Sequence, residues 1–237
     1  MRAVITFHHL GDARGPLAFP VASFTSLVRS LATRGPPIVD LDRLLAPGAG
    51  AGVALVFDDG GRSVADAALP VLRDAGAPAH LFLCTGWPEG DAQARRGGDA
   101  FDPLDWGAVE RLHRGGVAIE SHTHGHPDLR GLDRARVEDE CARADALIQR
   151  HVGRAPRYFA FPFGRHDATS REVASTRYRA AFGTRLARLR DGDDRYALPR
   201  LDAHYLRGAM VRDRIDGFPA RLWLAARAAL RRLPGRR

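Results

Sequence analysis

Short apolar runs alternate with segments of helical periodicity along most of the chain. Largely apolar runs predict strands over residues 3–7, 53–57, 79–84, 117–120, 158–161, 179–183 and 198–201. The run at 53–57 is uninterrupted, and it and the strand at 79–84 are expected to be buried on both faces. Apolar residues that recur every three or four positions predict helices, over residues 22–34, 63–75, 103–114, 133–151 and 168–177. Strands alternating with helices are typical of a parallel α/β architecture, and 237 residues suit one α/β barrel.

The connections between these elements carry ordinary helix-end and loop signals. Ser63 is expected to cap its helix and Gly76 to end it. Residues 86–101 are rich in Gly, Asp and Arg and are expected to form a long exposed loop. Cys84 and Cys141 belong to no CxxC pattern, so both are expected to be buried thiols.

Polar residues that could carry chemistry follow the predicted strands. His8 follows the first strand, and Asp58 and Asp59 follow the second. His122 and His126 come after the strand at 117–120. Because the strands of a βα barrel end at one face, where the active site lies, we expect these side chains to lie close together.

Asp58 and Asp59 are adjacent carboxylates followed by two glycines, and this stretch alone leaves two interpretations open. An Asp-Gly sequence is common in solvated turns. Paired acids also suit a catalytic site in which one carboxylate holds a metal and the other accepts a proton. Partners elsewhere in the chain decide between the two.

His122 and His126 supply such partners, although a chain with ten histidines can produce this spacing by chance. Gly125 and Pro127 disfavour a helix here, so the two imidazoles would converge through a loop. Two imidazoles and one carboxylate bind zinc and leave positions open for water and substrate. Asp59 together with this pair is a more specific pattern than either motif alone.

The basic composition bears mainly on partners and location. The net charge of +8 comes from arginine alone, which permits contact with acidic glycans or anionic membranes. The arginines are spread throughout and no nucleic-acid-binding motif accompanies them, so nucleic acid is not an expected partner. The N-terminus lacks a signal-peptide core and no apolar window could span a bilayer. These features predict a cytoplasmic protein, with peripheral membrane contact left open.

Several stretches resemble motifs of the polysaccharide deacetylases, the NodB-homology family of carbohydrate esterases. Residues 57–60 (FDDG) are similar to the family's TFDDG motif, and residues 121–129 (SHTHGHPDL) resemble its SHTxxHPDL stretch. Residues 159–164 (FAFPFG) resemble its FAYPYG variant, and residues 104–106 (LDW) its L-T/D-W segment.

The N-terminal residues 6–12 (TFHHLGD) resemble the MYHRVGD start of one branch of this family. That branch includes exopolysaccharide poly-N-acetylglucosamine deacetylases. The resemblance runs from about residue 3 to residue 202 with the motifs in order. It implies a distorted, incomplete (β/α) barrel of the NodB type over residues 1–217.

The resemblance also implies a metal-dependent hydrolase that removes acetyl groups from N-acetylated sugars, with an acetylated glycan or its precursor as partner. Asp59, His122 and His126 would hold a divalent metal, zinc being expected, and Asp58 would be the general base. His8 would be the general acid.

Other residues are expected to support the site, and the role of Phe163 among them follows from the same resemblance. The backbone N–H of Phe163 would stabilise the oxyanion, and His204 is the alternative acid. Arg200 and Trp106 are expected to support the site from behind the ligands.

The motifs depart from the family at positions that affect the function expected. Ala160 stands where the better-known branch has an arginine that pairs with the base aspartate, and Arg200 is the candidate replacement. Gly61 replaces a frequent tyrosine, which removes a surface for sugar stacking. An O-acetyl esterase acting on a glycan and a catalytically weakened glycan-binding relative are therefore the alternatives.

The basic tail at residues 218–237 is predicted to form a helix through residue 233. Leu222, Ala226, Ala229 and Leu233 would share one apolar face, with Trp223 and Leu230 at its edge. That stripe is expected to pack against the barrel. The alternative is a helix that lies on an anionic membrane, in which case the stripe would be exposed.

Overall fold

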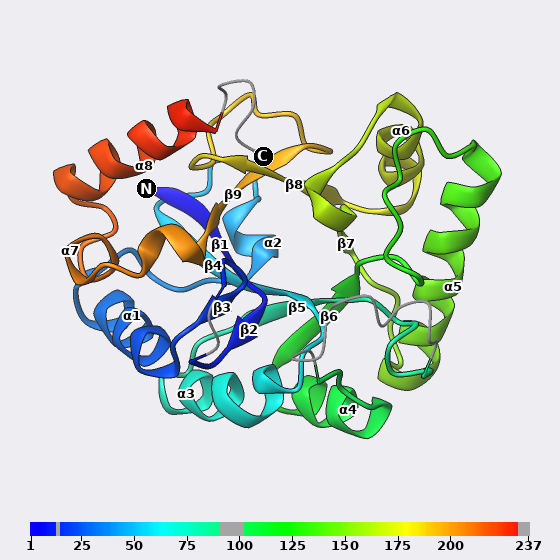
Figure 1. Cartoon of the computed structure of the whole chain (residues 1–237), viewed down its shortest axis with the longest axis horizontal. Coiled ribbons are helices and arrows are strands. Elements are labelled where there is room, and N and C mark those ends of the chain that lie inside the picture. The colour runs from blue at the N-terminus through cyan, green and yellow to red at the C-terminus, as the bar shows by residue number, and fades with distance from the viewer. Residues whose placement is uncertain (13–14, 91–101, 232–237) are drawn as a thin grey trace.

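Seven parallel strands close into a barrel in this computed structural model, which describes residues 1–12, 15–90 and 102–231 (Figure 1). Their order around the barrel is β1-β4-β5-β6-β7-β8-β9. The strands are β1 (Arg2–Phe7), β4 (Gly52–Asp59), β5 (Ala79–Leu83), β6 (Val117–Ser121), β7 (Tyr158–Ala160), β8 (Ala180–Leu186) and β9 (Leu198–Asp202). The predicted (β/α) barrel, incomplete relative to eight repeats, is confirmed.

Helices cover the outside of the barrel, as Figure 1 shows. They are α1 (Val21–Arg34), α3 (Leu69–Asp74), α4 (Trp106–Arg114), α5 (Arg134–Val152), α6 (Ala168–Arg177) and α8 (Phe218–Leu230). Shorter elements are α2 (Leu41–Leu44), α7 (Ala209–Arg212) and the two-stranded sheet of β2 (His9–Leu10) and β3 (Ala18–Phe19). The predicted elements recur with boundaries shifted by a few residues.

Alternate residues of each strand pack on opposite faces, and this alternation aims the site residues. In β4, Val53, Leu55 and Phe57 pack outward in the cluster that includes Phe24 of α1. Ala54 and Val56 belong instead to a second cluster, formed with inward residues of other strands. Asp58 continues the inward row, because side chains alternate along a strand. The sequence alternation thus places a carboxylate inside the end of the barrel.

One expectation for the connections was wrong, and another holds only in part of the loop that it concerned. Ser63 makes no cap hydrogen bond, since its Oγ accepts the N–H of Leu10 at 3.0 Å and its helix opens with a π-helical turn, Val64–Ala68. Trp87, in the expected exposed loop 86–101, is buried. Residues 91–101 of that loop lie outside the described residues. Cys84 and Cys141 are buried free thiols, as expected.

The C-terminal helix packs on the barrel through a different face from the one predicted. Ala220 and Leu224 are its buried residues, whereas Leu222 is 63% exposed. Ala226 and Ala229 of the predicted stripe are also exposed, and Leu233 lies outside the described residues. No helix within the described ranges is long and apolar enough to cross a bilayer.

We predict that two leucines of α8 differ sharply in their contribution to stability. Leu224→Ala should lower the free energy of unfolding by about 2–4 kcal/mol, because it removes a buried side chain and leaves a cavity. Leu222→Ala should change it by less than about 0.5 kcal/mol, since that side chain is already in water. Urea titration followed by circular dichroism measures both, and equal losses would contradict the packing of α8 described above.

Candidate active site

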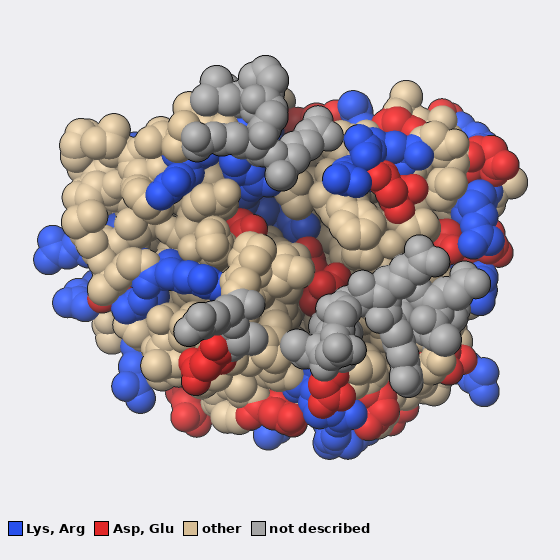
Figure 2. All heavy atoms as spheres, in the orientation of Figure 1, with Lys and Arg blue, Asp and Glu red and all other residues tan. Residues whose placement is uncertain are grey.

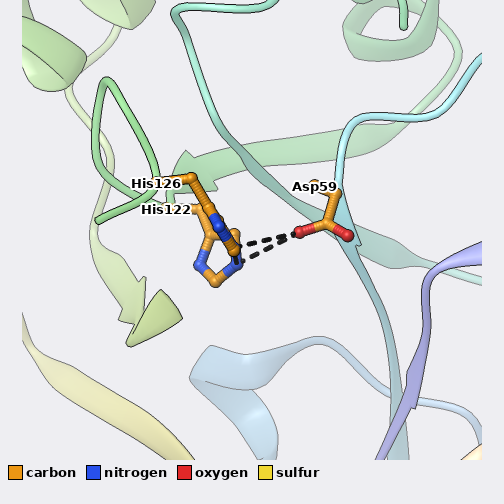
Figure 3. A group of neighbouring side chains, drawn as sticks. All are labelled: Asp59, His122 and His126. Carbon is orange, nitrogen blue, oxygen red and sulfur yellow. Dashed lines mark hydrogen bonds and ion pairs between the residues drawn. The ribbon is translucent and has the colours of Figure 1, made fainter. Parts of the chain in front are cut away.

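Asp59, His122 and His126 bring three potential ligand atoms together at the end of the barrel (Figure 3). Asp59 Oδ1 lies 3.4 Å from Nε2 of His122 and 3.4 Å from Nε2 of His126. The two Nε2 atoms are 3.2 Å apart. Figure 3 shows the carboxylate approaching the histidines from across a gap, so the three donors point toward one region.

A backbone acceptor fixes which nitrogen of the neutral His122 ring carries the proton. Its Nδ1 donates a hydrogen bond to the carbonyl of Ala160 at 2.7 Å, because a carbonyl oxygen can only accept. The Nε2 atom of the neutral ring then carries a lone pair directed at Asp59 and His126. Two imidazoles and a carboxylate with that orientation fit a divalent transition metal.

Burial and charge act against each other on these groups. Burial alone would lower the pKa of His122, but the hydrogen bond to Asp59 and the charges of Asp58 and Asp59 raise it. Burial would raise the pKa of Asp59, whereas hydrogen bonds from both histidines hold it well below its ordinary range. A proton therefore competes with a metal at His122 as the pH falls.

A buried carboxylate from the outer helix layer fixes the loop between the two histidines. Glu140, on α5, accepts the backbone N–H of Gly125 at 2.7 Å and that of His124 at 3.2 Å. A Cβ at Gly125 would lie 3.3 Å from Glu140 Oε1, so the loop and the carboxylate are in close contact. Arg136 donates to the same carboxylate at 3.2 Å. The loop that carries His126 is thus anchored to α5.

Backbone strain is concentrated at this site. Among the residues that the structure describes, the non-glycine residues with positive φ are Asp59, Thr123, His126 and Phe163. Two of them are candidate ligands, Thr123 accepts the His126 N–H on its Oγ1 at 3.0 Å, and Phe163 packs on the His126 ring. Positive φ costs of order 1 kcal/mol or more for a residue with a Cβ, and such strain clusters at functional sites.

Asp58 lies beside the three donors in a buried ion pair. Arg200 of β9 donates from Nη1 to Asp58 Oδ1 at 2.7 Å, and its Nε donates to the carbonyl of Gly183 at 2.9 Å. Burial would raise the pKa of Asp58, but the charges of Arg200, His122 and His8 and the hydrogen bond from Arg200 together hold the pKa below the ordinary value. Asp58 is therefore ionised at neutral pH, with Arg200 supplying a positive charge that Ala160 cannot.

His8 reaches the same carboxylate from β1. Its Nε2 lies 3.8 Å from Asp58 Oδ2, and about a fifth of its side chain is exposed. His204 makes no recorded contact with Asp58 in the described part of the chain, and its ring packs on Tyr205 instead. The structure thus brings His8, rather than His204, to the candidate base.

Two aromatic side chains flank His126 at the mouth of the site. Phe163 lies 4.6 Å from the His126 ring, centre to centre, and is 55% exposed. Trp87, in the loop after β5, is buried, and its ring centre lies 5.8 Å from that of His126. Sequence reasoning missed Trp87, although the rule that site residues follow strands would have found it, because it comes four residues after β5 ends.

Trp106 was expected beside the ligands, and its contacts lie elsewhere. The indole stacks on His151 of α5 at 4.0 Å and donates to Glu89 at 2.5 Å. Within the described residues, none of its recorded contacts involves Asp58, Asp59 or the two histidines. It begins α4, and the helix carries it to the outer layer.

Comparison with known proteins gives consistent matches. A sequence model of a family described as polysaccharide deacetylase matches residues 47–180. A chitin deacetylase of Arthroderma benhamiae is 27% identical over 128 residues, which are 53% of this chain and 32% of that protein. The chain spans about a third of the length of this protein and of a second chitin deacetylase, from Pestalotiopsis.

Solved structures share the barrel. The structure of IcaB from Ammonifex degensii has a TM-score of 0.72 and 25% identity, covering 84% of this chain and 90% of that one. The Streptococcus pyogenes deacetylase PplD, in complex with acetate, has a TM-score of 0.75 and 18% identity, covering 85% and 91%. The second likeness bears on the fold alone.

We predict that Glu140 controls metal affinity through the loop it anchors. Glu140→Gln should weaken zinc binding by about ten- to a hundredfold, because residues that orient metal ligands typically contribute that much. Competition with a chromophoric chelator measures the affinity. Glu138→Gln, two residues earlier on α5 and half-exposed, is the matched control and should bind zinc as the unaltered chain does.

Proposed function

This chain belongs to the polysaccharide deacetylase family, and on that premise we propose that it is a metal-dependent hydrolase that removes acetyl groups from N-acetylated sugars. The observation that carries the proposal is the placement of an ionised Asp58 next to three convergent donor atoms. A ligand set without an adjacent proton acceptor would suit a structural metal equally well. The neighbouring base favours hydrolysis.

Asp59, His122 and His126 would hold the metal. A divalent ion bound there, with zinc favoured, would polarise the acetyl carbonyl and make water more acidic. The anchored loop and the Ala160 carbonyl keep both imidazoles in the orientation that binding needs. These residues thereby spare the site a reorganisation cost when the substrate arrives.

Asp58 would act as the general base. Its carboxylate is ionised, since Arg200, His122 and His8 together hold its pKa low, and it lies inside the end of the barrel, where water would attack the acetyl carbon. The same arginine limits how strongly Asp58 attracts a proton. Arg200 therefore lowers the basicity of the Asp58 carboxylate but fixes its orientation and keeps it ionised.

His8, whose Nε2 atom lies 3.8 Å from Asp58 Oδ2, would act as the general acid. When the tetrahedral centre collapses, the bond between the acetyl carbon and the sugar nitrogen breaks, and the departing amine takes the His8 proton. The backbone N–H of Phe163 would donate to the oxyanion, and the positive φ of that residue turns its peptide away from an ordinary helical direction.

The substrate class is supported by one relative and by an exposed aromatic side chain at the site. The relative is named a chitin deacetylase, and chitin is a polymer of N-acetylated sugar. The family model matches residues 47–180, a range that includes Asp58, Asp59 and the two histidines. Exposed Phe163 offers an apolar surface against which a sugar ring could stack. An O-acetyl esterase acting on a glycan is the alternative, because the same groups would hydrolyse an ester.

Acetate release is the experiment that tests the function. The zinc-reconstituted protein should release acetate from N-acetylglucosamine oligomers or lipid-linked N-acetylated sugars, and less from O-acetylated glycans. Removal of the metal by a chelator should abolish release, and its return should restore it. Release from O-acetylated glycans alone would replace the amide with the ester as substrate. A protein that binds zinc and glycan yet releases no acetate would be a binding relative.

We predict that substitutions of the base and of a metal ligand have different effects on zinc binding. Asp58→Asn should lower kcat by about a hundredfold or more and retain zinc, because the three donors are untouched and the proton acceptor is lost. His122→Ala should lose zinc affinity as well as activity. Zinc content by mass spectrometry alongside acetate release distinguishes them, and equal zinc loss in both variants would show that the two roles were assigned wrongly.

We predict that His8→Ala lowers kcat much more than it raises KM, because acid catalysis acts in the transition state. His204→Ala should leave kcat nearly unchanged and serves as the control histidine. Steady-state kinetics on an amide substrate provide both constants. A larger loss in His204→Ala would transfer the acid role to that residue.

A further inference from the structure

The solvent-facing side of α8 is apolar, which is the reverse of an ordinary surface helix. Phe218 and Leu222 are 73% and 63% exposed. Trp223 and Leu230 are partly exposed, and several alanines lie between them at the surface. Of the exposed residues in α8, all of which are described, Arg221 alone is charged. In Figure 2 the surface over α8, at the upper left, is mostly tan.

The neighbouring helix extends this apolar surface. Met210 of α7 is 69% exposed, and α7 packs against α8. The indole of Trp223 is held in place, because its Nε1 donates to the carbonyl of Tyr205 at 3.0 Å and the Arg227 guanidinium lies 4.1 Å over its ring. We call the exposed apolar residues Met210, Phe218, Leu222, Trp223 and Leu230 the α8 face. Exposed apolar surfaces of this kind mark sites of interaction.

A cavity of about 550 Å³ lies beside the α8 face and is rich in arginine. It is bounded by α8 and by residues 185–190, which form the end of β8 and the segment after it. Leucine and alanine side chains form its apolar wall. Its arginines are Arg2, Arg185, Arg188, Arg190 and Arg221.

The acidic groups near the cavity do not match its positive charge. Asp191 pairs with Arg2 at 3.0 Å and Asp193 with Arg185 at 2.5 Å. Arg188 donates to the carbonyl of Ile215 at 2.7 Å. Its pKa is lowered by burial and by the charge of Arg221, against the attraction of Asp216. The cavity therefore keeps an excess of guanidinium groups beside an apolar face.

We propose that the α8 face binds the surface of an anionic phospholipid membrane, with a lipid phosphate entering the arginine-lined cavity. An apolar helix face inserts among acyl chains, and adjacent arginines attract anionic headgroups. Guanidinium groups suit phosphate because they donate two parallel hydrogen bonds. The proposal is independent of the hydrolytic function.

Charge argues against a second copy of this chain as the occupant. A two-fold contact places the same surface on both partners, so the arginines of the two cavities would approach each other. Like charges brought together at a partly desolvated interface oppose association. A negatively charged surface removes that conflict.

Vesicle co-sedimentation of the whole chain tests the proposal. Binding should be strong to vesicles of phosphatidylcholine mixed with phosphatidylglycerol and weak to phosphatidylcholine alone. Leu222→Asp should weaken binding about tenfold or more, because it places a charge among acyl chains. Arg188→Gln and Arg221→Gln should each weaken it about fivefold. Brominated lipids should quench Trp223 fluorescence in the unaltered chain, with Trp223→Phe identifying that signal.

Two matched variants control for general effects of charge and exposure. Leu17→Asp replaces an exposed leucine outside α8, and Arg150→Gln removes an exposed arginine from α5. Both should bind anionic vesicles as the unaltered chain does. Thermal unfolding of each variant verifies that it is folded.

Three results would overturn the proposal. Unchanged vesicle binding in Leu222→Asp would exclude the α8 face. Concentration-dependent dimerisation that Leu222→Asp abolishes, without vesicle binding, would identify a second copy as the occupant. Binding of inorganic phosphate that depends on Arg221, again without vesicle binding, would reduce the cavity to a site for a soluble anion.

Discussion

The buried ion pair between Asp58 and Arg200 is the interaction on which the site depends. Their side chains are each only 3% exposed and join β4 to β9 across the end of the barrel. Removing two charges from water is costly, and the hydrogen bond from Arg200 to the Gly183 carbonyl offsets part of that cost. Loss of one partner would leave an uncompensated charge inside the barrel. The pair fixes the charge state of Asp58 and links it to barrel closure.

Backbone strain at the site residues is the second feature that defines the geometry of the site. Asp59, His126 and Phe163 adopt backbone angles that residues with a Cβ avoid, and each is over-determined by surrounding contacts. Glu140 holds the loop from one side while the barrel fixes Asp59 and His122 from the other. The barrel and α5 therefore position the backbone that carries the donors, and the positive φ angles set the direction in which the donor side chains point.

The sequence predicted the barrel and the convergence of the donors because both follow from local rules. Apolar runs identify strands buried on two faces, and strand ends collect at one edge of a barrel. Helix ends and faces were less predictable, since they depend on tertiary partners. Ser63 had a nearer donor in Leu10 than in its own helix. On α8, Leu224 and Leu222 are equally apolar, and only the position of the barrel decides which one is buried.

The hydrogen bond from His122 to the Ala160 carbonyl bears on how such a site can change over evolutionary time. Because a main-chain oxygen orients the imidazole, the side chain at position 160 is free to vary without disturbing the ligand. An arginine could be lost from β7 once Arg200 of β9 supplied its charge. The positive charge beside Asp58 would then come from β9 instead of β7, while the three donor residues stayed the same. A family motif can therefore lose a characteristic residue although the charge balance of the pocket is kept.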